Sequence, residues 1–273
     1  MMRISSKISL LYYAYMNKET ILGGAVVLIL LGGIVFYTAT KPSPAKAPGA
    51  VIDVPHLSGA SYTEKAPYYE ITANYASSTP LLATVGPEAN ATAVGLMKKF
   101  VSDTITAFKT DGNFAHLSTE DVKMMGFDKG RKETLQIMYL IASSAHTITY
   151  IYTINTDTLG AHGNTSFKTF TFDTKTGAEL SLKSISKPDA DYLTKISLIA
   201  RTRLAEALGK GADLSMLTAG TQPDDTNFAS FFFDNEDFVI LFAPYQVAPY
   251  ALGPQTLRIP LSELSDVIRA EYR

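Results

Sequence analysis

The stretch Thr147-Ile-Thr-Tyr-Ile-Tyr-Thr-Ile154 has the alternation that decides the fold. A period of two places one set of large apolar side chains on the same face of a strand, namely Ile148, Tyr150, Tyr152 and Ile154. Threonines occupy most of the opposite face. Because β-branched and aromatic residues are typical of half-buried antiparallel sheets, this stretch predicts a strand with one face on a hydrophobic core.

Comparable patterns on both sides of this stretch predict further strands. Together the predicted strands span residues 68–75, 135–141, 148–154, 167–172, 228–233, 238–242 and 256–259. The polar residues between Phe233 and Phe238 predict a hairpin, and the short spans between most strands favour hairpins over crossover connections. The sequence therefore predicts antiparallel sheets.

Three segments carry apolar residues at a helical spacing of three to four. The first follows Pro87 and ends near Gly112, the second spans residues 188–208 with Pro188 in its first turn, and the third spans residues 262–272. Helices that interrupt runs of strands are typical of the α+β class rather than α/β. We therefore predict an α+β fold, with helices packed on antiparallel sheets.

An uncharged apolar segment lies near the N-terminus, at residues 21–39. About 19 helical residues, each rising about 1.5 Å, cover roughly 28 Å, close to the hydrocarbon thickness of a bilayer. The segment predicts one transmembrane helix that acts as an uncleaved signal anchor; a cleaved signal peptide is the alternative. Residues 1–20 would form a short cytoplasmic tail, which Met16 would shorten if it were the true start.

The remaining chain would then lie outside the cytoplasm, attached to the cell membrane by this single span. Residues 40–58 are rich in proline and alanine and predict an extended linker. The chain has no cysteine, so no disulfide and no lipid-modified cysteine is available. A net charge of −2 argues against nucleic acid as a partner.

His162 is the first candidate site residue. It lies in a predicted loop between strands, with Gly160 and Gly163 on either side. Glycines allow close backbone approach, so the imidazole could anchor a ligand, or act as a base supported by Asp157. A turn histidine that bonds a backbone carbonyl is the simpler interpretation. Asn164 follows in the same loop and is a second candidate ligand-binding residue.

Tyr245 and Tyr250 are the other candidate ligand-binding residues. They lie in a loop between two predicted strands that also contains Pro244, Pro249 and Pro254. The prolines forbid regular strand pairing and stiffen the loop. The tyrosines therefore either cover the end of the sheet or form rigid aromatic contacts for a glycan or a protein.

The common signatures of catalysis and cofactor binding are missing. The four histidines do not pair at zinc-ligand spacing, and neither a Gly-x-Ser-x-Gly motif nor a phosphate-binding glycine loop occurs after the apolar segment. We therefore predict no metal, no cofactor and, on balance, no catalytic activity.

Two segments resemble a known exported bacterial domain. They are Gly160-Ala-His-Gly-Asn164 with the strand that ends at Asp173, and Phe242-Ala-Pro-Tyr-Gln-Val-Ala-Pro-Tyr-Ala-Leu-Gly253 with Ile259-Pro260. The resemblance is to the domain shared by the anti-sigma factor RsiV and the N-terminal region of the peptidoglycan deacetylase PdaC. It implies a PdaC-like N-terminal lobe over residues 59–143 and an RsiV-like C-terminal lobe over residues 144–273.

The resemblance also implies an α+β domain at the bacterial envelope. RsiV-like receptors bind lysozyme, and PdaC-like proteins act on peptidoglycan through a separate catalytic domain. Neither the deacetylase domain nor a cytoplasmic segment of sufficient length for a sigma factor is present in these 273 residues. We therefore expect a membrane-anchored binding domain for peptidoglycan or a lysozyme-like enzyme. The alternatives are a cell-wall hydrolase that uses His162 and Asp157, and a structural envelope component.

Overall fold

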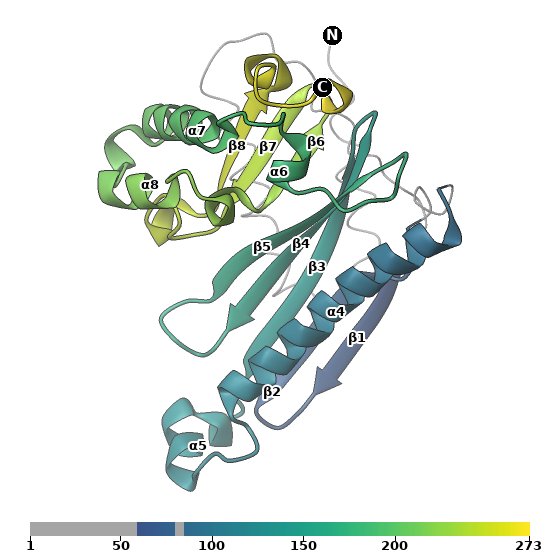
Figure 1. Ribbon diagram of the computed structural model, residues 1–273. Helices are drawn as coiled ribbons and strands as arrows, with labels where there is room; N and C mark the ends of the chain where they lie inside the picture. The colour runs from purple at the N-terminus through teal and green to yellow at the C-terminus, as the bar shows by residue number, and fades with distance from the viewer. Residues whose placement is uncertain (1–58, 80–84) are drawn as a thin grey trace, which may run out of the picture. The chain divides into compact units, whose positions relative to one another are not determined.

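The computed structural model describes residues 59–79 and 85–273. These residues form two β-sheets with helices packed on them, which confirms the predicted α+β class (Figure 1). The predicted tail (1–20), anchor (21–39) and linker (40–58) lie outside the described residues. Within the described part of the chain, no helix combines the length and apolar character needed to cross a membrane.

The larger sheet has five strands, which lie side by side in the order in which they occur in the chain. They are β1 (Gly59–Lys65), β2 (Tyr69–Ala76), β3 (Glu133–Ser143), β4 (Thr147–Asp157) and β5 (Asn164–Asp173). β4 lies between β3 and β5, and its Tyr150 faces Ile141 on one side and Phe170 on the other. β3, β4 and β5 include the strands predicted there, and β2 is shifted by one residue from the strand predicted at residues 68–75. β1 was not predicted.

One pairing in this sheet differs from expectation. β2 and β3 run parallel, with Ile71 opposite Leu135, whereas the other three pairings are antiparallel. The expectation of purely antiparallel sheets is therefore wrong at this pair. The physical reason is the long connection between the two strands. A helix in this connection returns the chain to the end of the sheet at which β2 begins, as parallel pairing requires.

That helix is α4 (Pro87–Gly112), which begins and ends where the sequence predicts. Pro87 occupies the first helical position, where its missing N–H costs nothing, and Asn113 ends the helix in the left-handed conformation with φ of 47°. The buried side chains of α4 are Ala93, Met97, Val101 and Phe108. They share a hydrophobic core with the alternating apolar residues of β2, β3, β4 and β5.

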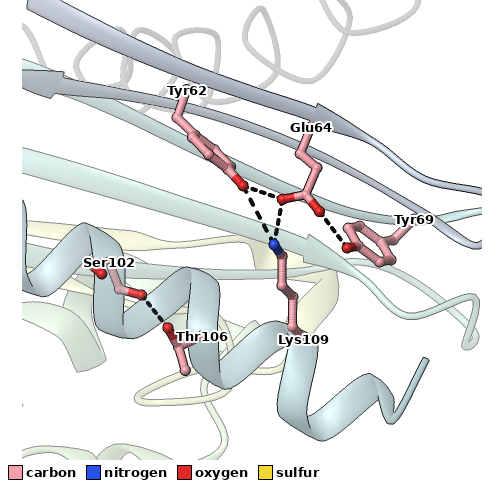
Figure 2. A network of polar contacts seen from close by, with 6 residues as sticks. All are labelled: Tyr62, Glu64, Tyr69, Ser102, Thr106 and Lys109. Carbon is pink, nitrogen blue, oxygen red and sulfur yellow. Dashed lines mark hydrogen bonds and ion pairs between the residues drawn. The ribbon is translucent and has the colours of Figure 1, made fainter. Parts of the chain in front are cut away.

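A polar network joins α4 to the edge of the sheet (Figure 2). The Lys109 ammonium of α4 and the Tyr62 hydroxyl of β1 both bond the Glu64 carboxylate, and the Tyr69 hydroxyl of β2 donates to it at 2.5 Å. Bonding to Lys109 first, and then to the two tyrosines, lowers the pKa of Glu64 to about 2. The network therefore holds β1 in place.

The smaller sheet has three antiparallel strands, β6 (Phe231–Asp234), β7 (Asp237–Phe242) and β8 (Gln255–Pro260). Two helices, α7 (Tyr192–Leu208) and α8 (Leu214–Gly220), bury side chains in the same core as these strands. The predicted hairpin between residues 233 and 238 is confirmed. Two shorter α-helices are α5 (Thr119–Met125) and α6 (Leu182–Ile185).

Three predictions in this half of the chain are wrong: the start of one helix, the start of one strand, and the presence of a C-terminal helix. The helix predicted from residue 188 begins at Tyr192, because Asp189 has φ of 58° and the Asp191 carboxylate caps the helix by accepting from the Thr194 N–H. Phe228 ends a 3₁₀ turn (Asp225–Phe228) rather than beginning a strand. Residues 262–272 do not form one α-helix, since Ile268 pairs as an isolated bridge with Ser186 between two 3₁₀ turns (Leu261–Leu264 and Ala270–Tyr272).

The two sheets have separate hydrophobic cores. The buried residues of the first core come from the chain up to Phe172, and those of the second come from Leu180 onwards. The predicted lobes, 59–143 and 144–273, do not coincide with these cores, because β3 and β4 pair across that boundary. Threonine side chains of β5 connect the two sheets. The Thr169 hydroxyl accepts from the Phe231 N–H at 3.2 Å, and the Thr171 hydroxyl donates to the Phe231 carbonyl at 3.3 Å.

Candidate functional site: an exposed histidine–tyrosine cluster

The turn between β4 and β5 carries His162. At the start of this turn the Asp157 carboxylate accepts from the Leu159 N–H at 2.8 Å, and Leu159 has φ of 61°. At its end, a Cβ added to Gly163 would lie 3.2 Å from the Thr156 carbonyl oxygen. A larger residue at position 163 would therefore crowd the backbone of β4, which explains the glycine directly after His162.

The connection between β7 and β8 carries the two tyrosines, and buried residues and hydrogen bonds fix its position. Val247 is buried in the core of the smaller sheet, and Ala248 beside it is also buried. The Gln246 side chain accepts from the Ala243 N–H at 3.2 Å and donates to the Asn227 carbonyl at 2.9 Å. At the end of α8, a Cβ added to Gly220 would lie only 1.9 Å from the Gln246 carbonyl oxygen. This connection is therefore a fixed support rather than a free loop.

His162, Tyr245 and Tyr250 form one group, here called the aromatic cluster. The rings of His162 and Tyr250 are stacked, with 3.7 Å between centroids and 17° between planes. Tyr245 and Tyr250 lie 5.5 Å apart in a tilted arrangement. Two segments that are distant in the sequence are thus joined through side-chain rings, as their predicted positions at strand ends suggested.

The hydrogen bonds of the aromatic cluster determine which nitrogen of His162 carries the proton. Nδ1 lies 2.9 Å from the Gly163 carbonyl oxygen, which can only accept, so Nδ1 donates. The Tyr250 hydroxyl donates to the same carbonyl at 3.0 Å. In the neutral ring Nε2 is then an acceptor, and the Tyr245 hydroxyl, at 3.0 Å, donates to it.

The aromatic cluster faces solvent. His162 is exposed, and 51% of the Tyr245 surface is accessible although the ring is large and apolar. Tyr245 also has φ of 68°, a conformation that costs a non-glycine residue energy and tends to occur at functional positions. The exposed apolar side chain of Leu252 lies in the 3₁₀ turn that begins at Tyr250.

Asn164, the fourth predicted site residue, is placed differently. It begins β5 and pairs in register with Thr156. In the described part of the chain, no hydrogen bond or ring contact joins its side chain to the aromatic cluster. The structure therefore brings three of the four predicted residues into contact and leaves Asn164 at the base of the same turn.

The proposed catalytic pair of His162 and Asp157 is not formed. Both ring nitrogens of His162 have other partners, and the Asp157 carboxylate is engaged by the Leu159 N–H. An imidazole whose Nδ1 is bonded to a carbonyl, without a carboxylate behind it, is oriented but not assisted as a base. The arrangement suits binding through ring faces better than proton transfer.

Sequence reasoning missed the residues that support the aromatic cluster. Gly220 packs closely against the backbone of the β7–β8 connection, and Gln246 fixes that connection through its hydrogen bonds. Both roles are visible only from contacts between residues that are distant in the sequence. Gln246 lies between the two tyrosines in the sequence, which could have marked it as a candidate. Gly220 offers no comparable signal, because a glycine at the end of a helix is ordinary.

Part of the chain is similar to a described family. Residues 183–262 match the family described as "Protein of unknown function (DUF3298)". A crystal structure of a DUF3298 family member from Bacteroides fragilis NCTC 9343 covers 83% of this chain and 96% of its own, with a TM-score of 0.53 and 16% identity. At that identity the likeness shows a common fold.

Two sequence relatives extend this comparison. The chain is 42% identical over 113 residues to the peptidoglycan-N-acetylmuramic acid deacetylase PdaC of Bacillus subtilis, covering 41% of this chain and 24% of PdaC. It is 24% identical over 109 residues to the immunogenic protein MPT64 of Mycobacterium tuberculosis H37Rv, covering 40% of this chain and 46% of MPT64. The chain thus spans less than half the length of either relative. The resemblance to the PdaC-like domain is confirmed.

Proposed function

We propose that this chain, which carries a DUF3298 domain related to part of PdaC, is a membrane-anchored binding domain of the bacterial cell envelope. Its ligand would be peptidoglycan, and a lysozyme-like enzyme is the competing candidate. The observation that carries the proposal is the aromatic cluster, in which exposed rings are held on a rigid support. The relative that acts on peptidoglycan supports the choice of ligand.

Fixed aromatic rings lower the entropic cost of binding. Tyrosine offers a large contact area with few rotatable bonds, so little side-chain freedom is lost when a ligand covers it. Stacking between His162 and Tyr250 restricts those two rings further, and the bond from Tyr245 to His162 orients the outermost ring. A sugar ring or a partner's apolar side chain could pack against such a surface with its polar groups at the rim.

The localisation part of the proposal depends on residues 21–39 as an uncleaved anchor. A short tail would remain in the cytoplasm, and the folded domain would lie outside on its proline-rich linker. A reporter enzyme that is active only outside the cytoplasm, fused after Arg273, should be active in intact cells. An inactive reporter together with a soluble full-length chain would reject this topology.

The ligand is tested by pull-down of the full chain in detergent with insoluble peptidoglycan and, separately, with immobilised lysozyme. Replacing Tyr245 and Tyr250 with alanine should reduce capture by at least about tenfold, which corresponds to about 1.4 kcal/mol. Leu140→Ala is the matched control, because Leu140 is 63% exposed on β3 and lies outside the aromatic cluster. Undiminished capture by a folded double variant would reject the assignment of the site.

The two pull-downs also separate the ligands. Capture by peptidoglycan alone supports the proposed function as stated. Capture by lysozyme alone would identify the lysozyme-like enzyme as the ligand, with the aromatic cluster still as its binding site. A hydrolase would instead release soluble fragments from peptidoglycan, and His162→Ala would abolish that release. Capture by neither ligand would favour a structural component of the envelope.

A further inference from the structure

Glu133 is a carboxylate in the position of a core residue. It begins β3 and shares the face of Leu135 and Ile137, the face covered by α4. Only 6% of its surface is exposed. Within the described residues, its side chain makes neither a hydrogen bond nor an ion pair. A buried carboxylate without a partner is costly and is a recognised mark of a binding site.

The basic residues beside Glu133 are engaged elsewhere. The Arg131 guanidinium donates to the Leu159 carbonyl at 3.4 Å, and the Lys132 ammonium bonds the Glu70 carboxylate at 3.0 Å. Burial raises the pKa of Glu133, and the negative charge of Asp157 raises it further. A cation supplied from outside the chain would offset both effects.

A groove of about 560 Å³ gives access to Glu133. Its walls come from the C-terminal end of α4, from α5 and from the adjacent ends of β3 and β4. α5 and the C-terminal end of α4 lie in the lower part of Figure 1. Most of its wall is apolar and includes Phe108, Leu117, Met124, Met125 and Phe127. Met124 is 76% exposed, although it is a large apolar side chain.

The charged side chains that line the groove are all acidic. Asp111 and Asp121 also line it. Bonds from the hydroxyl and the N–H of Ser118 lower the pKa of Asp121, which keeps that carboxylate ionised. Together with Glu133, these groups favour a positively charged occupant and disfavour an anion.

We propose that this groove binds a lysine or arginine side chain of a partner polypeptide. The aliphatic stem would lie on the apolar wall, and the cationic head would pair with Glu133. Lys and Arg are the side chains that combine a hydrocarbon stem with a charged end. A metal ion fits less well, because no group of three or more histidine, aspartate or glutamate residues in the described chain is arranged to hold one.

The groove and the aromatic cluster have no residue in common. The inference therefore goes beyond the proposed function and does not depend on peptidoglycan binding. A partner protein could occupy the groove whether or not the aromatic cluster holds a glycan. Failure of one proposal would leave the other intact.

The experiment uses the full chain in detergent with ¹³C-labelled methionine methyl groups. Met124 and Met125 report on the groove, and Met97, Met138 and Met216 report on other regions. The probes are the N-acetyl methylamides of lysine, arginine and norleucine, together with methylammonium. Norleucine keeps the stem and lacks the charge, whereas methylammonium keeps the charge and lacks the stem.

The lysine and arginine probes should shift the Met124 and Met125 signals in a saturable way. Norleucine and methylammonium should bind at least roughly tenfold more weakly, as should lysine to the Glu133→Gln variant. Glu133→Gln should leave the fold intact, because it removes the free-energy cost of burying a charge without a partner. Asp111→Asn, on the exposed rim, gives a second variant, with an expected loss of about two- to threefold.

Three results would overturn the proposal. One is equal affinity for the lysine and norleucine probes, and another is unchanged affinity for lysine in both variants. The third is equal affinity for lysine and methylammonium, which would indicate a site for small cations rather than for a polypeptide side chain.

Discussion

The ring of Tyr250 lies against the imidazole of His162, with 3.7 Å between centroids, while its hydroxyl donates to the Gly163 carbonyl at 3.0 Å. The imidazole Nδ1 bonds the same carbonyl. One backbone oxygen therefore positions both rings. Because the carbonyl belongs to the β4–β5 turn and Tyr250 to the β7–β8 connection, this contact joins the larger sheet to the smaller one.

The first prediction concerns the proton of His162. Since Nδ1 must donate to the Gly163 carbonyl, the neutral ring should be the tautomer protonated at Nδ1, which is the rarer one in water. Nitrogen-15 NMR of labelled histidine should show this directly. Tyr245→Phe removes the donor to Nε2 and should move the Nε2 signal more than the Nδ1 signal. A ring protonated at Nε2 would contradict the described hydrogen bonds.

The second prediction concerns the support of the aromatic cluster. Gly220→Ala would place a methyl group 1.9 Å from the Gln246 carbonyl oxygen, so the loop must move. We expect a loss of about 1–3 kcal/mol in the free energy of unfolding and weaker ligand capture. Gly95→Ala is the matched control: nothing lies within 4 Å of its added Cβ inside α4, and it should stabilise by about 0.5–1 kcal/mol. Equal effects of the two changes would show that Gly220 has no supporting role.

The third prediction compares two buried tyrosines on the same face of β4. The Tyr150 hydroxyl is buried without a hydrogen-bond partner among the described residues, whereas the Tyr152 hydroxyl accepts from the Ala76 N–H at 3.3 Å. Tyr150→Phe should therefore leave the free energy of unfolding unchanged or raise it. Tyr152→Phe should lower it by about 1 kcal/mol, because the Ala76 N–H loses its partner. Denaturant unfolding of the two variants measures the difference.

The fourth prediction is a pH dependence. The pKa of Glu64 is lowered from 4.5 to about 2 in the folded chain, chiefly by its bond to Lys109. Its stabilising effect is therefore complete above pH 4.5 and is lost as the pH falls towards 2. Glu64→Gln should destabilise by about 1 kcal/mol near pH 7, and the difference from the wild type should shrink in acid.

Glu70→Gln provides the control for this measurement. Among the described residues Glu70 pairs with Lys132 only, and its side chain is 41% exposed, so its replacement should have a smaller effect near pH 7. The free energy of unfolding is measured for both variants and the wild type between pH 7 and pH 2.5. A Glu64→Gln difference that grows in acid would have the wrong sign for this network.

The sequence was sufficient for the elements with strong local patterns. Strands β3 and β4 alternate apolar and polar residues, and α4 carries an apolar stripe between a proline start and an Asn113 end, so each was predicted close to its observed position. These segments bury the face that their own pattern defines. Local pattern and tertiary environment agree there, which is the condition under which such reasoning works.

The failures lie where distant contacts decide. β1 begins with Gly59-Ala-Ser61, which has little strand propensity, and it is held by the bond between Glu64 and Lys109. Residues 262–272 have helical spacing, but the Lys187 N–H donates to the Val267 carbonyl at 2.8 Å and the Arg269 N–H to the Ile185 carbonyl at 3.0 Å. Bonds to a remote segment thus override the helical tendency.

The candidate site shows the same division. The proximity of His162, Tyr245 and Tyr250 could be predicted, because all three lie in loops at strand ends. Strand ends can be located from the alternation of apolar and polar residues. The close approach of Gly220 to Gln246, and the lack of an ion-pair partner for Glu133 among the described residues, depend on three-dimensional packing. Extending the alternation of β3 backwards from Ile137 and Leu135 would have placed Glu133 on the core face.

The parallel pairing of β2 with β3 has a consequence for the order of folding. β3, β4 and β5 are joined by short turns, so they can zip together through small loops. β2 can dock only after the 26 residues of α4 have spanned the sheet, and β1 in turn depends on β2. The amide hydrogens of residues 59–76 should therefore exchange with solvent sooner than those of β4, and mechanical pulling from the N-terminal side should peel this edge away first.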